Sequence, residues 1–295
     1  MASGPMTITT ADKHIGEVWP SAVIRAEEFS LVIAPRVYRE WKFAGFGDVY
    51  NVPRIPNIEA ATKSGGTDWT PTNYTDTEQT ITINVHQVAG FEIEDITKLL
   101  ASTNLEMEMR KKIGYSLGRA VDVNLATLPQ SFSQIVGTLG DELDYEDFVD
   151  AMQLIEEAGI EGTDDCTWIV STACKFGMLK QDVFMSSLYS GGSGGRAVEQ
   201  AKVGKLLGAP VLKSNLTRAP AGGQSESFLF YKQAMALIMA QEVKIVTEYR
   251  AKGLSMVVGG HQVYGYAEVD RYDEAPGNIT ASDKWCVLLR TVGAA

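Results

Sequence analysis

The feature that most constrains this chain is a long polar segment, Asn57 to Thr77, between two stretches that favour extended strands. Gly47 to Ile55 is typical of an extended segment, and Glu78 to Ile93 alternates isoleucine and valine with polar residues, as a half-buried strand does. We expect these two strands to pair. The polar segment is longer than loops in compact domains usually run and has too few apolar residues to fold alone. It is therefore either disordered or held by something outside its own domain.

A long amphipathic helix is predicted next in the chain. Thr103 and Glu106 match a capping box that would begin it. Apolar residues then recur at spacings of four or three, which lays one stripe along about seven helical turns. The residues of this stripe are Met109, Ile113, Leu117, Val121, Leu125 and Leu128.

The charges of this helix are predicted to pair with one another. Glu106 precedes Arg110, and Glu108 precedes Lys112, by four residues, which is the favourable order for ion pairs on one helix face. The basic residues therefore need no nucleic acid to explain them, and we expect them on a face turned to solvent or to an interface. They are Arg110, Lys111, Lys112 and Arg119.

After Pro129 the pattern changes to alternating helices and strands, which predicts an α/β lobe. The expected elements are a helix from Asp144 to Ala158 ended by Gly159, a strand from Trp168 to Ser171, a helix from Thr172 to about Lys180, short strands around Val211 and from Phe228 to Tyr231, and a helix to about Gln241.

The last part of the chain is predicted to be mostly long strands. Alternation from Val243 to Tyr249, a turn from Arg250 to Gly253 and a strand from Leu254 to Val269 indicate a long hairpin. Gly259-Gly260 is the expected site of a β-bulge. Trp285 to Arg290 is expected to form the final strand.

Composition excludes several classes of protein. The 295 residues are 45% hydrophobic, enough for a packed core, and no stretch approaches the roughly 20 apolar residues of a membrane span. A net charge of −11 argues against binding to a phosphate backbone, which needs clustered Lys and Arg. The three cysteines form no C-x-x-C pair, so we expect buried thiols rather than disulfides or a zinc site.

One motif suggests catalysis. Gly191, Gly192, Ser193, Gly194 and Gly195 match the nucleophile-elbow pattern G-x-S-x-G, with Arg196 to Leu207 as the helix that should follow. A serine hydrolase would use Ser193 with His261 as the base and Glu242 or Glu248 to orient it. No strong buried strand precedes the motif, however, and its composition is that of a flexible linker. We favour a mobile loop and expect no catalytic residue.

Metal and cofactor sites are not indicated. Acidic residues crowd Asp141 to Asp165, but without the spacing of a calcium loop they are better read as a solvated helix face with Asp144 as its N-cap. His14, His86 and His261 are scattered and show no paired metal-ligand spacing.

Four stretches carry a resemblance to a known family. They are Asp48-Val-Tyr-Asn-Val-Pro-Arg-Ile55, Ile81-Thr-Ile-Asn-Val85, Glu94-Asp-Ile-Thr-Lys-Leu-Leu-Ala-Ser102 and Ile113-Gly-Tyr-Ser-Leu-Gly-Arg-Ala-Val-Asp122. Together with the order of elements, they resemble the major capsid proteins of tailed bacteriophages that have the HK-ninety-seven-like fold. The resemblance covers nearly the whole chain.

The resemblance implies an α+β capsid fold with four parts. These are an N-terminal arm (residues 1–46), an extended E-loop hairpin (47–93), a peripheral domain (94–132 and 244–283, with a spine helix over 103–128) and an α/β axial domain (133–243 and 284–295). The glycine-rich loop at 191–195 would belong to the axial domain.

The resemblance also implies assembly and partners. Many copies would form pentamers and hexamers of an icosahedral shell in the host bacterial cytoplasm, with the E-loop tip contacting a neighbouring subunit; the tip residues are Lys63, Ser64, Gly65, Gly66, Thr67, Asp68 and Trp69. The shell would enclose double-stranded DNA without binding it specifically. No long charged helical segment precedes the arm, so a separate scaffolding protein or an earlier maturation cut is implied, and a portal and a decoration protein are further expected partners.

Two questions stay open at this point. Lys63 and Asn278 are candidates for a covalent crosslink between subunits, but no flanking motif supports them. The same fold also serves encapsulins, bacterial compartments that resemble these coats and enclose an enzyme, so a compartment shell is the alternative use. The serine hydrolase is an alternative from a different class.

Overall fold

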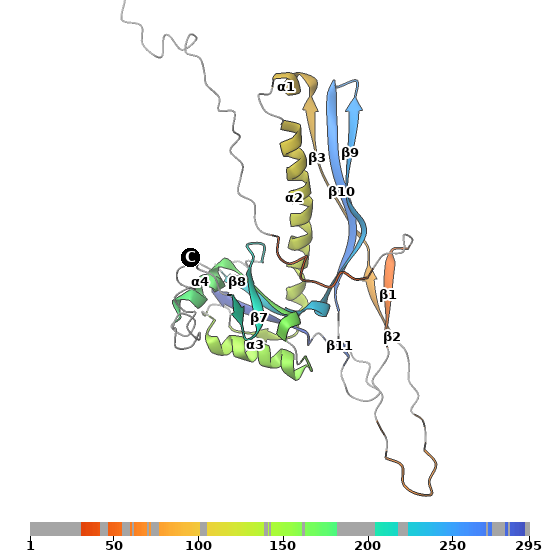
Figure 1. The fold of residues 1–295 in the computed structure, drawn as a ribbon, viewed down its shortest axis with the longest axis vertical. Coiled ribbons are helices and arrows are strands. Elements are labelled where there is room, and N and C mark those ends of the chain that lie inside the picture. The colour runs from red at the N-terminus through yellow and green to blue at the C-terminus, as the bar shows by residue number, and fades with distance from the viewer. Residues whose placement is uncertain are drawn as a thin grey trace, which may run out of the picture.

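The structure is a computed structural model that describes residues 31–41, 47–54, 60, 62–69, 71, 77–100, 105–138, 141, 143–160, 163–181, 204–217, 224–269, 271–272, 281–282 and 284–292. These residues form an elongated sheet with a long helix along it, a lobe of mixed helices and strands, and a projecting hairpin (Figure 1).

The elongated part is a three-stranded antiparallel sheet in the order β3-β10-β9, covered on one face by helix α2. Its strands are β3 (Val85–Glu94), β9 (Met235–Arg250) and β10 (Ser255–Glu268), and α2 spans Leu105–Leu125. The short helix α1 (Asp95–Leu100) lies between β3 and α2 at the far end (Figure 1).

Helix α2 packs closely on this sheet because the sheet lacks side chains where the helix crosses it. Ile113 and Leu117 form a buried cluster with Val258. A Cβ atom added at Gly260 would lie 2.5 Å from Ile113 Cγ2 and 3.2 Å from Leu117 Cδ1. Gly260 is therefore a close-packing position, and the helix rests directly on backbone there.

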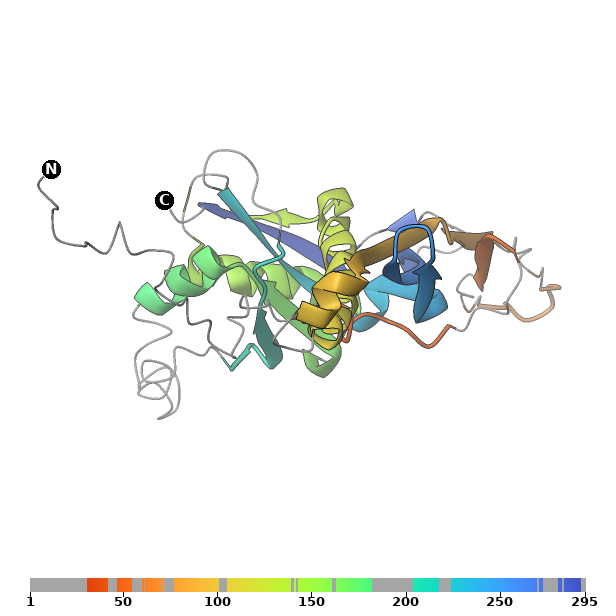
Figure 2. The ribbon, with the colours of Figure 1, turned by 90° about the horizontal axis from the view of Figure 1, so that it is seen from above.

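The lobe is a six-stranded sheet in the order β4-β13-β8-β5-β7-β6 (Figure 2), and helices α3 and α4 pack against one of its faces. Its elements are β4 (Ile135–Val136), α3 (Tyr145–Glu157), β5 (Cys166–Val170), α4 (Thr172–Lys180), β6 (Lys205–Leu206), β7 (Ala209–Lys213), β8 (Gln224–Tyr231) and β13 (Cys286–Val292), with single-turn 3-10 helices at Leu128–Ser131, Thr163–Asp165 and Lys232–Ala234.

Alternate residues of the lobe strands supply two different cores. Trp168 and Leu229 face a cluster that contains Phe148 and other residues of α3 and α4. Ile169 and Phe228 face the opposite cluster, which contains the end of α2 and residues of the segment 31–41. The sheet is therefore buried on both faces, and its second face joins the lobe to the helix and to that segment.

The projecting hairpin pairs β1 (Val49–Arg54) with β2 (Thr77–Thr82), and two-residue strands β11 (Arg271–Tyr272) and β12 (Ala281–Ser282) pair separately. Ile81 is fully buried in a cluster with Ala236 and Ile238 of β9. The base of the hairpin is thus fixed to the rest of the molecule.

Several predicted elements are confirmed. The helix after Asp144 ends at Gly159, which has a φ of +82°, and the turn and hairpin of the tail lie where the alternation placed them. Leu105–Leu125 forms most of the predicted long helix. Thr103, its expected capping residue, lies outside the described residues.

The predicted helix that ended near Gln241 is wrong. After one 3-10 turn at Lys232–Ala234, β9 begins at Met235 and continues to Arg250. Met235 to Ile238 are all buried, on both faces of the strand. A short apolar run of this kind has no period that distinguishes a strand from a buried helix.

Two strand predictions need correction. The segment Glu78 to Ile93 forms two strands, β2 and β3, because the chain breaks its pairing at Ile83 and Asn84 and changes partner from β1 to β10. The bulge expected at Gly259-Gly260 lies instead near His261 to Tyr264, where the register with β9 shifts.

Candidate assembly surfaces

The hairpin tip is exposed along its whole described length, from residue 62 to residue 69. Thr67 closes a turn by donating from its backbone N to Ser64 O at 3.3 Å and from its Oγ1 to the same oxygen at 2.9 Å. Gly66 has a φ of +86°, which other residues rarely adopt. Trp69 is 58% exposed, although an indole of this size is usually covered.

The tip is carried by a base with several anchors. Ile83 N donates to Asp48 O at 2.7 Å, and Gln79 Nε2 donates to the Glu268 backbone oxygen at 2.6 Å. The Trp41 and Tyr50 rings stack with centroids 6.0 Å apart beside this base. An exposed tip on an anchored base is suited to reach another molecule.

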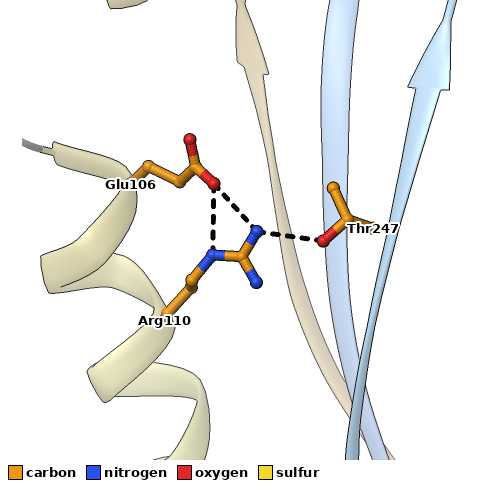
Figure 3. A network of polar contacts seen from close by, with 3 residues as sticks. All are labelled: Glu106, Arg110 and Thr247. Carbon is orange, nitrogen blue, oxygen red and sulfur yellow. Dashed lines mark hydrogen bonds and ion pairs between the residues drawn. The ribbon is translucent and has the colours of Figure 1, made fainter.

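The charged face of helix α2 contacts β9 rather than facing only solvent. Arg110 donates to Glu106 Oε1 from Nε at 3.2 Å and from Nη2 at 2.8 Å, and Nη2 also donates to Thr247 Oγ1 at 3.0 Å (Figure 3). The predicted pair of Glu106 with Arg110 is confirmed.

The other basic residues of the predicted face behave differently. Glu108 contacts Lys111 at 3.4 Å, a pair three residues apart on the helix. Lys112 is half-buried and Arg119 is exposed. Arg110 is therefore directed at β9, whereas Lys111 pairs within the helix.

Asp122 is a functional candidate that the sequence reasoning missed. Its carboxylate is fully buried and accepts three backbone hydrogen bonds, from Val32 N at 2.8 Å, Ile33 N at 3.2 Å and Ala34 N at 2.9 Å. Leu31 lies over Gly118, where a Cβ atom would come within 2.8 Å of Leu31 Cδ1. Helix α2 therefore holds the segment 31–41, which follows residues 1–30 in the chain.

His86 and His261 come together in the fold, although they are 175 residues apart in the chain. Their ring centroids are 5.5 Å apart in an edge-to-face arrangement. They border a shallow hollow on the sheet face opposite α2, which Val88, Gly90, Val246 and Gly259 also line. A single sequence carries no signal for such a pair, because β3 and β10 are distant in the chain.

The catalytic interpretation gains no support from the described geometry. His261 lies opposite Lys244 in the strand register, and Glu248 lies opposite Val257, four residues or about 13 Å further along the strand. Leu206 belongs to strand β6, so the helix expected to run to Leu207 cannot do so. Ser193 and its glycines lie outside the described residues.

Other site types are limited in the same way. Among the described residues, no three His, Cys, Asp or Glu side chains are grouped as metal ligands would be. None of the helices described is long and apolar enough to cross a membrane. Burial raises the pKa of the Cys166 and Cys174 thiols to about 11, and all three cysteines are buried and form no disulfide bond.

Comparison with known proteins separates sequence from structure. No protein-family model matches the sequence, and no curated protein matches it. Solved structures do match, over nearly the full length of both chains. The capsid structure of the cyanophage P-SCSP1u has a TM-score of 0.76 at 14% identity and covers 97% of this chain and 95% of that chain.

Two further structures agree. The mature capsid of bacteriophage PhiM1 gives a TM-score of 0.73 at 13% identity, covering 95% of this chain and 93% of that chain. The capsid of a native GTA particle gives 0.69 at 11% identity, covering 99% and 100%. This chain has the phage capsid fold. The expected α+β capsid fold is confirmed.

Proposed function

We propose that this chain is the major capsid protein of a tailed bacteriophage, assembling as pentamers and hexamers into an icosahedral shell around double-stranded DNA. The observation that carries the proposal is the capsid fold over the whole chain, matched end to end with capsid structures. The exposed hairpin tip supports it, because a polar tip with an uncovered Trp69 gains a buried setting only against another molecule.

The proposal assigns a role to each part of the fold. The lobe acts as the axial domain (residues 133–243 and 284–295), and α2 with the long sheet acts as the peripheral domain (94–132 and 244–283). Residues 235–243 fall within the axial range but are the first nine residues of β9, a strand of the long sheet. Residues 47–93 act as the E-loop, although β3 within this range is a strand of the long sheet. Residues 1–46 act as an arm that crosses to a neighbour, held at its root by Asp122.

The charge of the chain supports enclosure of DNA without specific binding. The net charge is −11, and Glu106 and Glu108 contact basic residues of α2. Like charge on the shell wall would keep packaged DNA from adhering to it. A scaffolding protein, a portal and a decoration protein are proposed partners, and the mature location is the virion capsid.

The direct test is electron microscopy of the expressed chain with and without its neighbouring gene products. We expect shells of uniform size that protect DNA from nuclease when the phage is grown. Particles that hold a cargo enzyme and no DNA would favour a compartment shell instead. A chain that stays monomeric under every condition would contradict both uses of the fold.

The hairpin tip gives a sharper test within the same experiment. Trp69→Ala removes the exposed indole without touching the anchored base, so the subunit should fold normally while the yield of shells falls. Trp69→Phe keeps an aromatic ring and should retain most of the yield. In parallel, a fluorophosphonate probe should fail to label Ser193; labelling at that residue would revive the hydrolase.

A further inference from the structure

The outer edge of strand β9 is unpaired along half its length in the described structure. Near its start, Tyr38 N donates to Met235 O and Leu237 N donates to Tyr38 O, both at 2.9 Å. From residue 242 to residue 250 every residue is exposed, and β9 is the last strand in its sheet. The uncovered apolar side chains here are Val243 (44% exposed), Ile245 (42%), Val246 (48%) and Tyr249 (54%). A long, exposed edge presents unpaired backbone N–H and C=O groups, which are a template for pairing with another chain.

The sequence of this edge is complementary to itself. Residues 242–250 read Glu-Val-Lys-Ile-Val-Thr-Glu-Tyr-Arg. We propose that two copies of the chain pair antiparallel along β9, with Val246 of each copy on the two-fold axis, so that two sheets join into one of six strands. Lys244 then lies opposite Glu248 of the second copy, and Glu242 opposite Arg250 of the second copy. Val243 and Ile245 lie opposite Tyr249 and Thr247.

The charges permit one register and oppose its neighbours. In an antiparallel pair, the residue numbers of every two opposite positions add up to the same value. A two-fold axis perpendicular to the sheet keeps α2 on the same face in both copies, so this sum can change only in steps of two. One step in one direction places Glu242 opposite Glu248 of the second copy. One step in the other direction places Lys244 opposite Arg250. Like charges directly opposite are destabilising, so the Val246-centred register is selected.

The existing fold already orients the side chains for this contact. Lys244, Val246 and Glu248 pair with His261, Gly259 and Val257, on the sheet face away from α2. Ile245 and Thr247 pair with Gly260 and Val258, which lie against α2. The two opposite-charge pairs about the axis therefore share one face, and the apolar pairs share the other.

Two contacts hold the edge straight before any partner arrives. Thr247 accepts from Arg110 at 3.0 Å (Figure 3), and the Tyr249 hydroxyl donates to Asp95 Oδ2 at 2.7 Å. The outer pair of Glu242 with Arg250 is less rigidly placed, because a register shift lies beside residues 241–244 and Arg250 also contacts Glu92 at 3.4 Å. The central pairs, from Lys244 to Glu248, are the better-placed part of the contact, while Glu242 and Arg250 supply the repulsion that opposes the neighbouring registers.

A contact of nine residues per chain is too small to hold a dimer alone, since stable interfaces bury roughly 1,200–2,000 Å². Repeated many times in a closed assembly, weak two-fold contacts add up. The inference therefore rests on the proposed function. It assigns the β9 edge as the contact between subunits of neighbouring pentamers or hexamers.

Disulfide trapping tests the geometry. Val246→Cys places a thiol on the axis, where directly opposite Cβ atoms lie about 4.5–5.5 Å apart. Oxidation of assembled particles should give a dimer on a non-reducing gel. The native cysteines are buried and should not contribute. Val88→Cys, at 71% exposure on the opposite edge strand, is the matched control and should stay monomeric.

Charge exchange tests the register. In the Val246→Cys background, Lys244→Glu or Glu248→Lys alone should lower the dimer yield about tenfold, because attraction becomes repulsion at both symmetric pairs. The double variant restores opposite charges and should return to within about twofold of the parent. A double variant no better than either single variant would overturn the proposed register.

The outcomes separate this inference from the proposed function. Normal shells in which Val246→Cys crosslinks no more than Val88→Cys overturn the β9 contact and leave the capsid function standing. Particles that crosslink at position 246 but hold a cargo enzyme and no DNA support the contact and contradict the phage capsid function.

Discussion

Replacing the Asp122 carboxylate should loosen the segment 31–41 from helix α2. Three backbone N–H groups donate to this buried side chain, two of them to Oδ2 and one to Oδ1. Asp122→Asn keeps one acceptor oxygen but places an NH₂ group where the other oxygen accepts. The change removes at least one hydrogen bond to a charged group, which typically contributes about 1.5–3 kcal/mol.

Asp122→Ala should have the larger effect, and the structure limits how large it can be. It leaves three buried donors without an acceptor, but the segment can detach and return them to water. Detachment exposes Ile33 and Val37, which are 0% and 1% exposed, at about 1.5–3 kcal/mol each. We therefore expect losses of about 2–3 kcal/mol for the Asn variant and about 3–5 kcal/mol for the Ala variant.

Hydrogen exchange with mass spectrometry measures this locally. The peptide covering residues 31–41 should exchange faster in the Asn variant by about 30-fold to 150-fold, at tenfold per 1.4 kcal/mol. Peptides from the lobe strands should not change. Asp150→Asn alters the same group on an exposed face of α3 and serves as the control. If the peptide exchanges no faster in Asp122→Asn than in that control, the carboxylate does not hold the segment.

Two further predictions concern packing and the thiols. Gly260→Ala should destabilise the subunit by about 1–3 kcal/mol in urea unfolding, since its Cβ would meet Ile113 at 2.5 Å, whereas Gly259→Ala, with no atom within 4 Å, should have little effect; equal effects would show that α2 does not rest on Gly260. Cys166 and Cys174 should resist Ellman's reagent at pH 8 in the folded chain, because their raised pKa of about 11 leaves almost no thiolate below that pH, and should react after unfolding. Rapid labelling of both in the native state would contradict their burial.

The sequence predicted those elements whose signal is local. Helix α2 has a continuous apolar stripe, and the helix from Tyr145 has a recognisable start at Asp144 and a glycine at its end. Strand β10 alternates because every second residue from Val258 to Tyr264 is buried, whereas β9 from residue 242 to residue 250 alternates on two exposed faces. In each case the apolar period or the helix cap is determined by residues close together in the sequence.

The sequence could not predict features that depend on distant partners. Met235 to Ile238 form a strand because β10 pairs with them. The four apolar residues by themselves do not distinguish a strand from a helix. Asp122 lies beside the apolar stripe, and its backbone donors are about ninety residues away in the chain, so its neighbours in the sequence do not indicate its role. The meeting of His86 and His261, and the self-complementary edge, likewise became visible only when the strand order was known.

Strand β9 has a mechanical consequence for the whole subunit. Its first four residues are locked in the core beside the lobe, its last nine extend into the open sheet, and the register shifts opposite His261 to Tyr264 lie between them. A bulge bends and twists a strand locally. We therefore expect flexing to concentrate at this register shift, while the parts of β9 on either side of it stay rigid. Bending at the register shift would change the tilt of the long sheet against the lobe without repacking either half.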